Sequence, residues 1–384
     1  MADALSDILS SNKNLLFDYE FESNELESDK LSNSWMRPVN LEYRKNYTTQ
    51  FGSRTIDTAT FSVSINQPIF RFGGIYYGIK YAEALRHANR SDIALQKRKR
   101  IGDAVTILFN LKKSKLEQKK LTLLLKNDKI DIRQKRDSYT SGLLDSSFLD
   151  KAILKKSQDE ANLLESQLRM LELKEKFSLL SNKDPEKLKL PLLKPVSKTT
   201  YHAKNIALQR DRERASVASY KQKITWAKYL PTLSLQGQYI DGDINPLFAT
   251  PNAMLKEHYY TYGFSLSMPL DMNAFSDIEA SRVNRLKAAV QVLDTQESVN
   301  KEYIWIEKSL QMIDQKIALA QKEEKVYQNL YRVTKNLQKA GEKTSLDSAT
   351  MYNSLQIKKI DKKIYEIEKQ LYLLKLYIRM KHVL

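Results

Sequence analysis

The two halves of this sequence carry the same landmarks in the same order. Pro38, which opens a stretch of alternating side chains, has its counterpart in Pro231, 193 positions later. The segment Phe61–Pro68 returns as Tyr262–Pro269 at an offset of 201. An internal repeat of this length constrains the architecture more than any local pattern does. We therefore interpret the chain as a duplicated unit of about 195 residues.

A segment with three prolines separates the two copies of this unit. Residues 1–180 are expected to form the first repeat, with a helix, two strands, a long helix and a return helix in that order. Residues 200–384 are expected to form the second repeat with the same order. Residues 181–199 hold the three prolines, which interrupt helices, and are expected to form a linker or equatorial segment.

Four segments alternate apolar residues with small or polar ones, which is the period of a β-strand with two different faces. They are residues 39–49, 58–67, 232–241 and 259–268. In the second segment Phe61, Val63 and Ile65 alternate with Ser62 and Ser64, and in the fourth Phe264, Leu266 and Met268 alternate with Ser265 and Ser267.

Very long stretches without proline follow the second and fourth of these segments and indicate helices. These stretches are expected to form two outgoing helices, over 73–138 and 273–339, each with a length of roughly 100 Å. Return helices are expected over 146–181 and 346–382, and shorter helices over 4–36 and 200–229. Apolar residues step by four and three in narrow seams that are typical of coiled coils. These seams are Ile306-Leu310-Ile313-Ile317-Ala320, Val326-Leu330-Val333-Leu337 and Ala161-Leu164-Leu168-Leu171.

The chain is strongly basic, with 63 Lys and Arg against 46 Asp and Glu and a net charge of +17. Such a charge favours anionic surroundings, which include nucleic acid, acidic partners and lipid headgroups. The basic runs at 97–100, 112–115 and 358–363 either contact phosphates or form solvated helix faces. Aromatic residues are not interleaved with these runs, and this disfavours recognition of nucleic-acid bases.

No residue pattern indicates catalysis. The absence of cysteine excludes thiol chemistry, disulfides and Cys-based zinc sites. The four histidines are scattered, and none has a second histidine at helical ligand spacing. No apolar run reaches the 18 residues that a membrane-spanning helix needs. We predict a protein that is not an enzyme and that has neither a cofactor nor a metal site.

Two function classes fit these observations. A transport protein would place the four alternating segments in a membrane, with apolar side chains toward lipid and serines toward water. A soluble coiled-coil scaffold would use its basic surface to bind acidic partners or nucleic acid. Such a scaffold gives no reason for strands with one apolar and one serine face, so the alternation favours transport.

The duplicated pattern resembles the outer-membrane efflux factor family, the TolC-like exit ducts of Gram-negative bacteria. The matching motifs are Gln67-Pro-Ile-Phe-Arg-Phe-Gly-Gly74, Tyr229-Leu-Pro-Thr-Leu-Ser-Leu235, Phe264-Ser-Leu-Ser-Met-Pro-Leu270 and Gly341-Glu-Lys-Thr-Ser-Leu-Asp347. The second half departs from the family pattern in having Asp271–Phe275 in place of the double glycine. The strand-to-helix turns are assigned to Pro68, Gly73, Gly74 and Pro269.

This resemblance implies an outer-membrane duct with a periplasmic extension. It would belong to a tripartite efflux or type I secretion system and conduct small molecules or unfolded polypeptide passively. Its implied partners are a periplasmic adaptor protein, an inner-membrane pump and outer-membrane lipid, with no nucleic acid. The natural precursor is expected to carry a signal peptide, because this family requires one, and we expect that it has been removed.

Four strands per chain cannot close a barrel, and open edges in lipid leave backbone groups unpaired. We therefore predict a homotrimer with a 12-stranded transmembrane β-barrel above an α-barrel tunnel of long coiled-coil helices. Phe61, Val63, Ile65, Phe264, Leu266 and Met268 are expected to face lipid. The loops 50–57 and 242–258 would then lie outside the cell.

The helix-to-helix turns are expected to form the periplasmic tip and gate. Each begins with a glycine that can end a helix in the left-handed conformation. The resemblance implies that Asp347, six residues after Gly341, lies at the tunnel entrance. It also implies that Lys343 forms contacts that hold the tip closed. Asp347 as a simple helix cap is the alternative. The tip set is Gly142, Asp145, Asp150, Gly341, Lys343 and Asp347.

Overall fold

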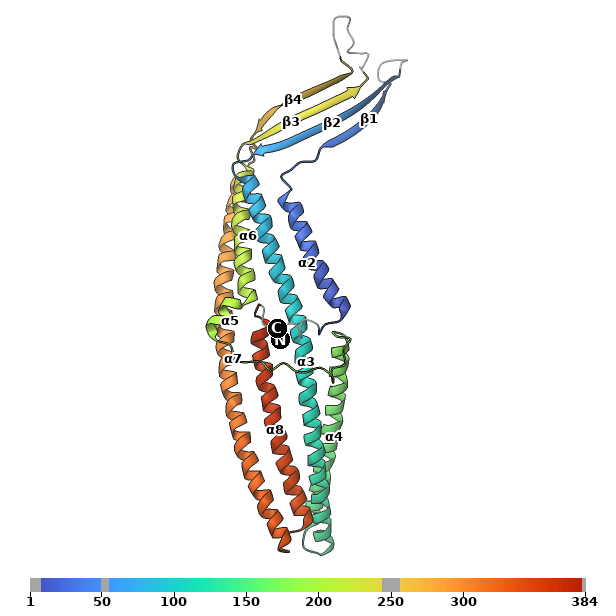
Figure 1. The fold of residues 1–384 in the computed structure, drawn as a ribbon, viewed down its shortest axis with the longest axis vertical. Helices are drawn as coiled ribbons and strands as arrows, with labels where there is room; N and C mark the ends of the chain where they lie inside the picture. Colours follow the sequence, from blue (N-terminus) through green and yellow to red (C-terminus); the bar gives the residue numbers. More distant parts are fainter. Residues whose placement is uncertain (1–7, 50–54, 244–255, 382–384) are drawn as a thin grey trace. The chain divides into compact units, whose positions relative to one another are not determined.

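The computed structural model describes residues 8–49, 55–243 and 256–381. Most of the described chain is helical, and a small sheet accompanies the helices (Figure 1). The elements, in chain order, are α2 (Ser11–Ser32), β1 (Asn40–Thr48), β2 (Ile56–Phe70), α3 (Gly74–Thr140), α4 (Ser146–Ser178), α5 (Lys198–Lys204), α6 (Ile206–Lys228), β3 (Thr232–Gly242), β4 (His258–Ser267), α7 (Ala274–Lys339) and α8 (Ser345–Ile378).

The predicted fold class, mostly α with a small β part, is confirmed. The two outgoing helices are α3 with 67 residues and α7 with 66, and their return helices are about half as long. The order of helix, two strands, long helix and shorter helix occurs once in each half of the chain. The segments 50–54 and 244–255, which make up most of the loops expected outside the cell, lie outside the described residues.

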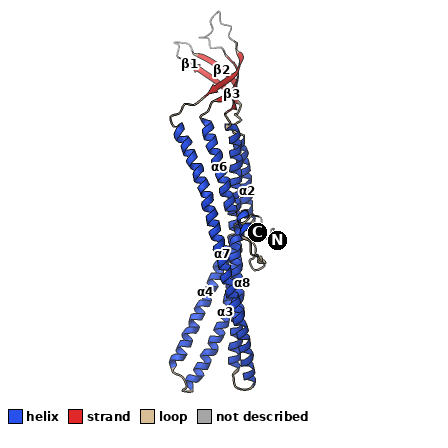
Figure 2. Ribbon diagram, turned by 90° about the vertical axis from the view of Figure 1, so that its left-hand side faces the viewer, coloured by secondary structure: helices blue, strands red, loops and turns tan. Residues whose placement is uncertain are grey.

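The four strands form one antiparallel sheet in the order β1-β2-β3-β4 (Figure 1), and the sheet is drawn in red in Figure 2. β2 is longer than the predicted 58–67 and extends through Pro68 to Phe70. The register between β2 and β3 shifts between Pro68 and Phe70. Proline has no N–H to donate to a ladder, so a proline inside a strand is accommodated at an irregularity of this kind.

The single helix expected over 200–229 is broken in two at Asn205. Asn205 has an extended backbone, with φ −70° and ψ 116°, and pairs with Met380 in an isolated antiparallel bridge. On either side of it, the N–H of Ile206 donates to the carbonyl of Arg379, and the N–H of Lys381 donates to the carbonyl of Lys204, both at 2.9 Å. Hydrogen bonds to Arg379 and Lys381 thus replace helical hydrogen bonds around Asn205.

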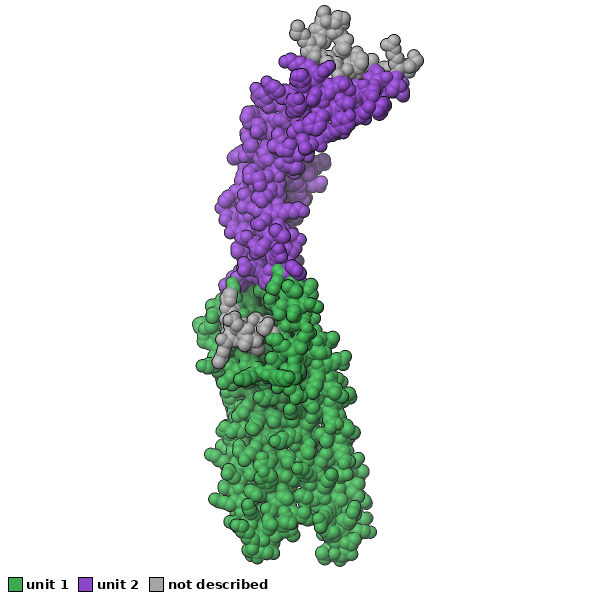
Figure 3. Space-filling view, turned by 45° about the vertical axis from the view of Figure 1, so that its right-hand side comes forward, with its two compact units in different colours: residues 1–18, 93–207, 296–384 green, residues 19–92, 208–295 purple. Residues whose placement is uncertain are grey.

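The chain divides into two compact units, and each unit combines segments from both halves of the sequence (Figure 3). Unit 1 contains residues 1–18, 93–207 and 296–384, and unit 2 contains residues 19–92 and 208–295. The main core of unit 1 includes Phe109 and Phe177, and a second cluster surrounds Tyr201 and Ile306. No helix among the described residues has the length and apolar character needed to cross a membrane.

Polar contacts order the four long helices of unit 1 as α4-α3-α8-α7. α3 and α8 are joined by a ladder of pairs spaced seven residues apart on both helices, which is the repeat of an antiparallel coiled coil. Its rungs are Lys113–Glu368 at 2.5 Å, Lys120–Asp361 at 2.7 Å, Asn127–Ser354 at 3.3 Å and Gln134–Asp347 at 3.0 Å. On the outer sides, Gln118 of α3 donates to the carbonyl of Ser166 in α4, and Lys358 of α8 pairs with Glu323 of α7.

The coiled-coil seams on the two outer helices face different surroundings. On α7, Ile306, Ile313 and Ala320 are buried, whereas Val326, Leu330 and Val333 are exposed. On α4, the seam residues Leu164, Leu168 and Leu171 are exposed as well. Within the described chain, therefore, only part of the predicted coiled-coil surface is covered.

Candidate functional site

The register of the sheet sorts its side chains into one apolar and one polar face. Paired residues of an antiparallel sheet point to the same side. Phe61 pairs with Tyr43, Val63 with both Leu41 and Tyr239, and Leu235 with Phe264. The mainly apolar face accordingly holds Leu41, Tyr43, Phe61, Val63, Ile65, Leu233, Leu235, Tyr239, Tyr260, Tyr262, Phe264 and Leu266, and the same register also places Lys45, Asp57, Gln67, Asp241 and His258 on it. It contains five of the six residues predicted to face lipid, and the sixth, Met268, follows the last residue of β4.

The opposite face is mainly polar, and the pair Ile240–Tyr259 is an apolar exception on it. Ser62 and Ser64 of β2 share it with Ser234 and Gln238 of β3 and with Ser265 of β4. Gln236, on the same face, donates to the hydroxyl of Ser265 at 3.0 Å. Arg44 and Glu42 also lie there and form an ion pair at 2.5 Å. This face therefore suits contact with water.

No described part of the chain covers the apolar face over β4. Phe264 is 71% exposed and Leu266 is 73% exposed. A water-soluble sheet normally buries such a face against a second layer. The described chain therefore leaves these apolar side chains uncovered.

The sheet also has two open edges. β1 pairs only with β2, and β4 pairs only with β3, among the described strands. Each edge presents unpaired N–H and C=O groups, which are a template for a strand of another chain. An edge is therefore available at both ends of the sheet, one on β1 and one on β4.

The first strand-to-helix turn depends on glycine. Gly73 has a φ of +82° and Phe72 a φ of +44°, both in the left-handed region. Gly74 begins α3, donates its N–H to the carbonyl of Arg71, and approaches Ala227 so closely that a Cβ would lie 3.2 Å from the Cβ of that residue. The double glycine thus combines a permissive backbone with close packing.

The second turn replaces glycine with aspartate. After β4 and Pro269, Asp271 accepts a hydrogen bond from the N–H of Asn273 through its side chain at 2.9 Å. Its carbonyl accepts from the N–H of Ala274, the first residue of α7. An aspartate turn can begin a helix in this way without a left-handed residue.

The two helix-to-helix turns have the same backbone geometry. Gly142 has a φ of +71° and Gly341 a φ of +81°. The N–H of Gly142 donates to the carbonyl of Tyr139, and that of Leu143 donates to Ser138; Gly341 and Glu342 repeat this pattern. These are the two bonds of a Schellman motif, which ends a helix at a glycine.

Two of the predicted tip carboxylates cap the return helices. Asp145 is the N-cap of α4 and accepts from the N–H of Ser147 at 2.8 Å, a bond that lowers the pKa of Asp145. Asp347 and Thr344 form a capping box at the start of α8. The N–H and the hydroxyl of Thr344 both donate to Asp347, and these bonds, with that from Gln134, lower the pKa of Asp347.

The remaining tip residues are less constrained. Asp150 is exposed in the second turn of α4, and Lys343 is exposed in the turn before α8. Within the described residues, neither forms an ion pair, although the charge of Lys343 contributes to lowering the pKa of Asp347. The six predicted tip residues therefore lie in the two helix-to-helix turns or in the first two turns of the helices that follow, and Asp145 and Asp347 have capping roles.

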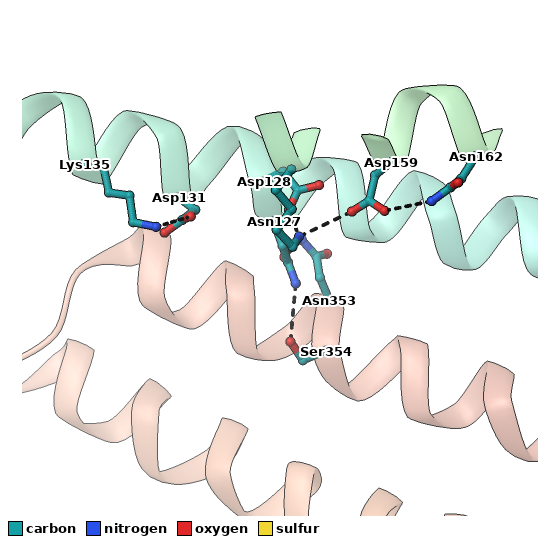
Figure 4. Close-up of polar contacts among 9 residues, drawn as sticks. Asn127, Asp128, Asp131, Lys135, Asp159, Asn162, Asn353 and Ser354 are labelled. Carbon is teal, nitrogen blue, oxygen red and sulfur yellow. Dashed lines mark hydrogen bonds and ion pairs between the residues drawn. The ribbon is translucent and has the colours of Figure 1, made fainter. Parts of the chain in front are cut away.

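A polar cluster around the buried Asp128 joins α3, α4 and α8 (Figure 4). Lys155 of α4 contacts Asp128 of α3 and lies 3.3 Å from Asp159. Asp128 is only 4% exposed, and its burial raises its pKa. On the α8 side, Asn353 donates to Asn127 at 2.9 Å. This cluster was not predicted from the sequence. The ladder residues recur every seven residues along both α3 and α8, and this spacing was a usable signal.

No group of three or more His, Asp or Glu side chains in the described chain is arranged to hold a metal ion. None of the three described histidines, His87, His202 and His258, belongs to the two helix-to-helix turns. His202 is partly buried, and this burial lowers its pKa.

Comparison with known proteins identifies the fold. No protein-family model matches the chain. No curated protein sequence matches it either. Among solved structures, the outer membrane protein VceC of Vibrio cholerae is similar, with a TM-score of 0.76 and 14% identity over 98% of this chain and 94% of that chain.

Two further structures agree. The CmeC outer membrane channel of Campylobacter jejuni has a TM-score of 0.76 and 14% identity, covering 98% of this chain and 85% of that chain. The open MtrE outer membrane channel of Neisseria gonorrhoeae has a TM-score of 0.72 and 10% identity, covering 98% and 88%. The chain therefore has the fold of these outer-membrane channels, and the expected resemblance is confirmed at the level of the fold.

The capping box predicts a measurable effect at the start of α8. Thr344→Ala removes a hydroxyl that accepts from the N–H of Asp347, so the free energy of unfolding should fall by about 1 kcal/mol. Amide hydrogen exchange in the first turn, Ser345–Ser348, should accelerate. Thr344→Ser keeps the hydroxyl and serves as the control. Equal exchange rates in the two variants would contradict the capping role.

The pH dependence of this turn follows from the lowered pKa of Asp347. A depressed pKa means that the stabilisation is complete above the ordinary value, about 4, and is lost as the pH falls through the lowered value. The protection of amides in the first turn of α8, measured against intrinsic exchange at each pH, should therefore fall below about pH 4 in the wild type. In Asp347→Ala this loss of protection with falling pH should be absent.

Proposed function

We propose that this chain is the outer-membrane exit duct of a tripartite efflux or type I secretion system. It would conduct small molecules or unfolded polypeptide passively, without catalysis of its own. The observation that carries the proposal is the four-stranded sheet with an uncovered apolar face, a polar face and two open edges. In a membrane barrel these become the lipid surface, the water-filled lumen and the junctions between copies.

The number of strands supports a homotrimer. β4 of one copy would pair with β1 of the next, so three copies would close a barrel of twelve strands. Closure is required because each unpaired backbone group in lipid costs several kcal/mol. Twelve strands also leave room for an aqueous lumen.

The helices of unit 1 support the same closure. α4 and α7 stand at the two ends of the contact order, and both carry exposed apolar stripes. On α7 the stripe is Trp305, Met312, Leu319, Val326 and Val333, each seven residues after the last, and on α4 it is Leu154, Leu164, Leu168 and Leu171. We infer that α4 of one copy packs against α7 of the next and so closes the α-barrel tunnel.

The remaining assignments follow from this arrangement. The chain would lie in the outer membrane with a periplasmic extension, after removal of a signal peptide. Its partners would be a periplasmic adaptor protein and an inner-membrane pump, with no nucleic acid. Residues 1–180 and 200–384 would be repeats of one ancestral unit joined by 181–199, and each repeat would supply two strands and a helical hairpin.

The oligomeric state and the conductance test this function together. In a mild detergent the native mass should correspond to three chains, and the same preparation should form channels in planar bilayers. A monomer that retains its helical content under these conditions would refute the duct. Leu168→Glu with Met312→Glu, in the proposed helix interface, should weaken the trimer, whereas Leu192→Glu, at an exposed linker position, should not.

Arginine substitutions test which face of the sheet meets lipid. Val63→Arg or Leu266→Arg would place a charge in the hydrocarbon, so the folded barrel should lose roughly 2–4 kcal/mol near the midplane. Ser64→Arg would place the same charge in the lumen and should be tolerated. Folding into vesicles, followed by urea titration, measures the difference. Equal losses at both faces would exclude the proposed orientation.

The gate role of the tip is testable by single-channel recording. Three copies of Asp347 would concentrate negative charge at one ring and favour cations there. Asp347→Asn should therefore reduce cation selectivity, and Lys343→Ala should enlarge the open fraction. Asp150→Asn, in the other tip turn, shows whether that turn also contributes. If selectivity and opening are unchanged in the first two variants, Asp347 is a helix cap only.

A further inference from the structure

The chain between α4 and α5 passes over α3 and α8 on its way across unit 1 (Figure 1). Beside α3 and α4 this linker closes a cavity of about 250 Å³. The two helices contribute three apolar side chains to the wall, and the linker contributes three more. They are Leu108, Leu111, Met170, Pro185, Leu188 and Leu190. The interior therefore suits a hydrocarbon group rather than a sugar or a nucleotide base, which would need several hydrogen-bonding partners.

The linker is fixed to the helices at two places. At one, the N–H of Glu186 donates to Asp184 at 3.0 Å, and the carboxylate of Glu186 pairs with Lys174 of α4 at 3.0 Å. At the other, Leu193 and Gln370 of α8 exchange two hydrogen bonds, of 2.7 and 3.3 Å. The part of the wall that the linker supplies is thus anchored, and the cavity is a preformed feature of the fold.

The polar groups of the wall are three lysines, Lys112, Lys115 and Lys174, and one glutamate, Glu186. Glu186 lies 3.0 Å from Lys174 and 3.9 Å from Lys115, and the hydrogen bond from Lys174 and the charge of Lys115 lower the pKa of Glu186. Among the described residues, the exposed Lys112 forms no ion pair. The opening of an apolar cavity therefore carries a cation without an acidic partner, and an anion there would be complementary to it.

We propose that this cavity binds a free fatty acid, with the alkyl chain among the apolar side chains and the carboxylate beside Lys112. A hydrocarbon interior with a cation at its opening matches both parts of such a molecule. A volume of 250 Å³ accommodates roughly eight carbons at ~30 Å³ each, which is one alkyl chain and not the two of a phospholipid. None of the lining residues belongs to the sheet or to the helix-to-helix turns, so this site goes beyond the proposed duct and does not depend on it.

Photolabelling of the full chain in phosphatidylcholine nanodiscs tests the location of the site. The probe is decanoic acid with a diazirine on its alkyl chain, at about pH 8, where a carboxylic acid is ionised. Mass spectrometry of the illuminated protein should find the label concentrated in segments 108–115, 170–174 and 185–190. Label distributed over the exposed surface, or confined to the strands, would show only partition onto apolar surface and would overturn the proposal.

Unlabelled competitors, compared at equal free concentration, separate the chain from the headgroup. Competition should strengthen about fourfold for each added methylene from hexanoate to octanoate, and should level off near decanoate, where the cavity is full. Decyltrimethylammonium, with an alkyl chain of similar length and the opposite charge, should compete at least tenfold less well than decanoate. Equal competition by these two compounds, or no dependence on chain length, would refute a fatty-acid site.

A pair of variants on α3 tests the cation. Lys112→Gln should weaken competition by decanoate about threefold, because an exposed ion pair contributes modestly. Lys119→Gln is the matched control, since Lys119 lies seven residues further along the same helix and is exposed but does not line the cavity. The control should change competition less than twofold. Equal losses in the two variants would show that Lys112 has no special role.

A second pair of variants tests the cavity itself. Leu190→Trp places a larger side chain in the wall and should remove the label from 170–174. Leu192→Trp, at a linker position that is 81% exposed, should leave the label in place. Circular dichroism shows whether each variant is folded, and the two glutamine variants decide the question if Leu190→Trp is not. Undiminished labelling of a folded Leu190→Trp would refute this site.

Discussion

A four-stranded antiparallel sheet that ends in two unpaired edges cannot be the final state of these strands in a membrane. Each edge of this sheet exposes backbone groups, and one face exposes Phe264 and Leu266. Water can satisfy the edges but not the apolar face, and lipid can satisfy the face but not the edges. In the proposed duct, lipid together with further copies of the strands would satisfy both. The open edges are therefore the constraint from which the proposed trimer and its lumen follow.

The long helices of unit 1 also leave apolar surface that the described chain does not cover. α3 and α8 are joined by a polar ladder that runs from charged rungs, Lys113–Glu368 and Lys120–Asp361, to neutral and capped ones near the tip. Polar pairs at heptad spacing fix the register of a coiled coil at some cost in stability. The outer helices α4 and α7 retain exposed apolar stripes, which other copies would cover in the proposed trimer. The sheet and the helices thus both leave apolar surface exposed.

Much of this fold could be predicted from the sequence because its signals are local. Periodicity located the long helices and the four strands, and Gly142 and Gly341 were recognised because a left-handed residue strongly favours glycine. The alternation of Phe61, Val63 and Ile65 with serines also fixed which residues share a face. These features need no knowledge of which segments meet in space.

Features that depend on distant contacts were not predicted. The break at Asn205 arises from bonds to Arg379 and Lys381, near the other end of the chain. The extension of β2 past Pro68 needs a bulge against β3. The ladder has a regular spacing on each helix, but the pairing of Asn127 with Ser354 cannot be known before the two helices are aligned. The exposed seam on α7 was likewise indistinguishable from the buried one, because both have the same periodicity.

The bonds of Asp347 show how a cap and a gate can share one carboxylate. One of its oxygens accepts from Thr344 within the turn, and the other accepts from Gln134 of α3 at 3.0 Å. The bonds within the turn move with α8, whereas the bond to Gln134 joins two helices and would break if those helices separated. Loss of that bond would leave one oxygen without its donor and would strengthen the negative field at the opening. The capping box would meanwhile keep Asp347 ionised and the start of α8 folded, so the charge would be held at a defined place in both states.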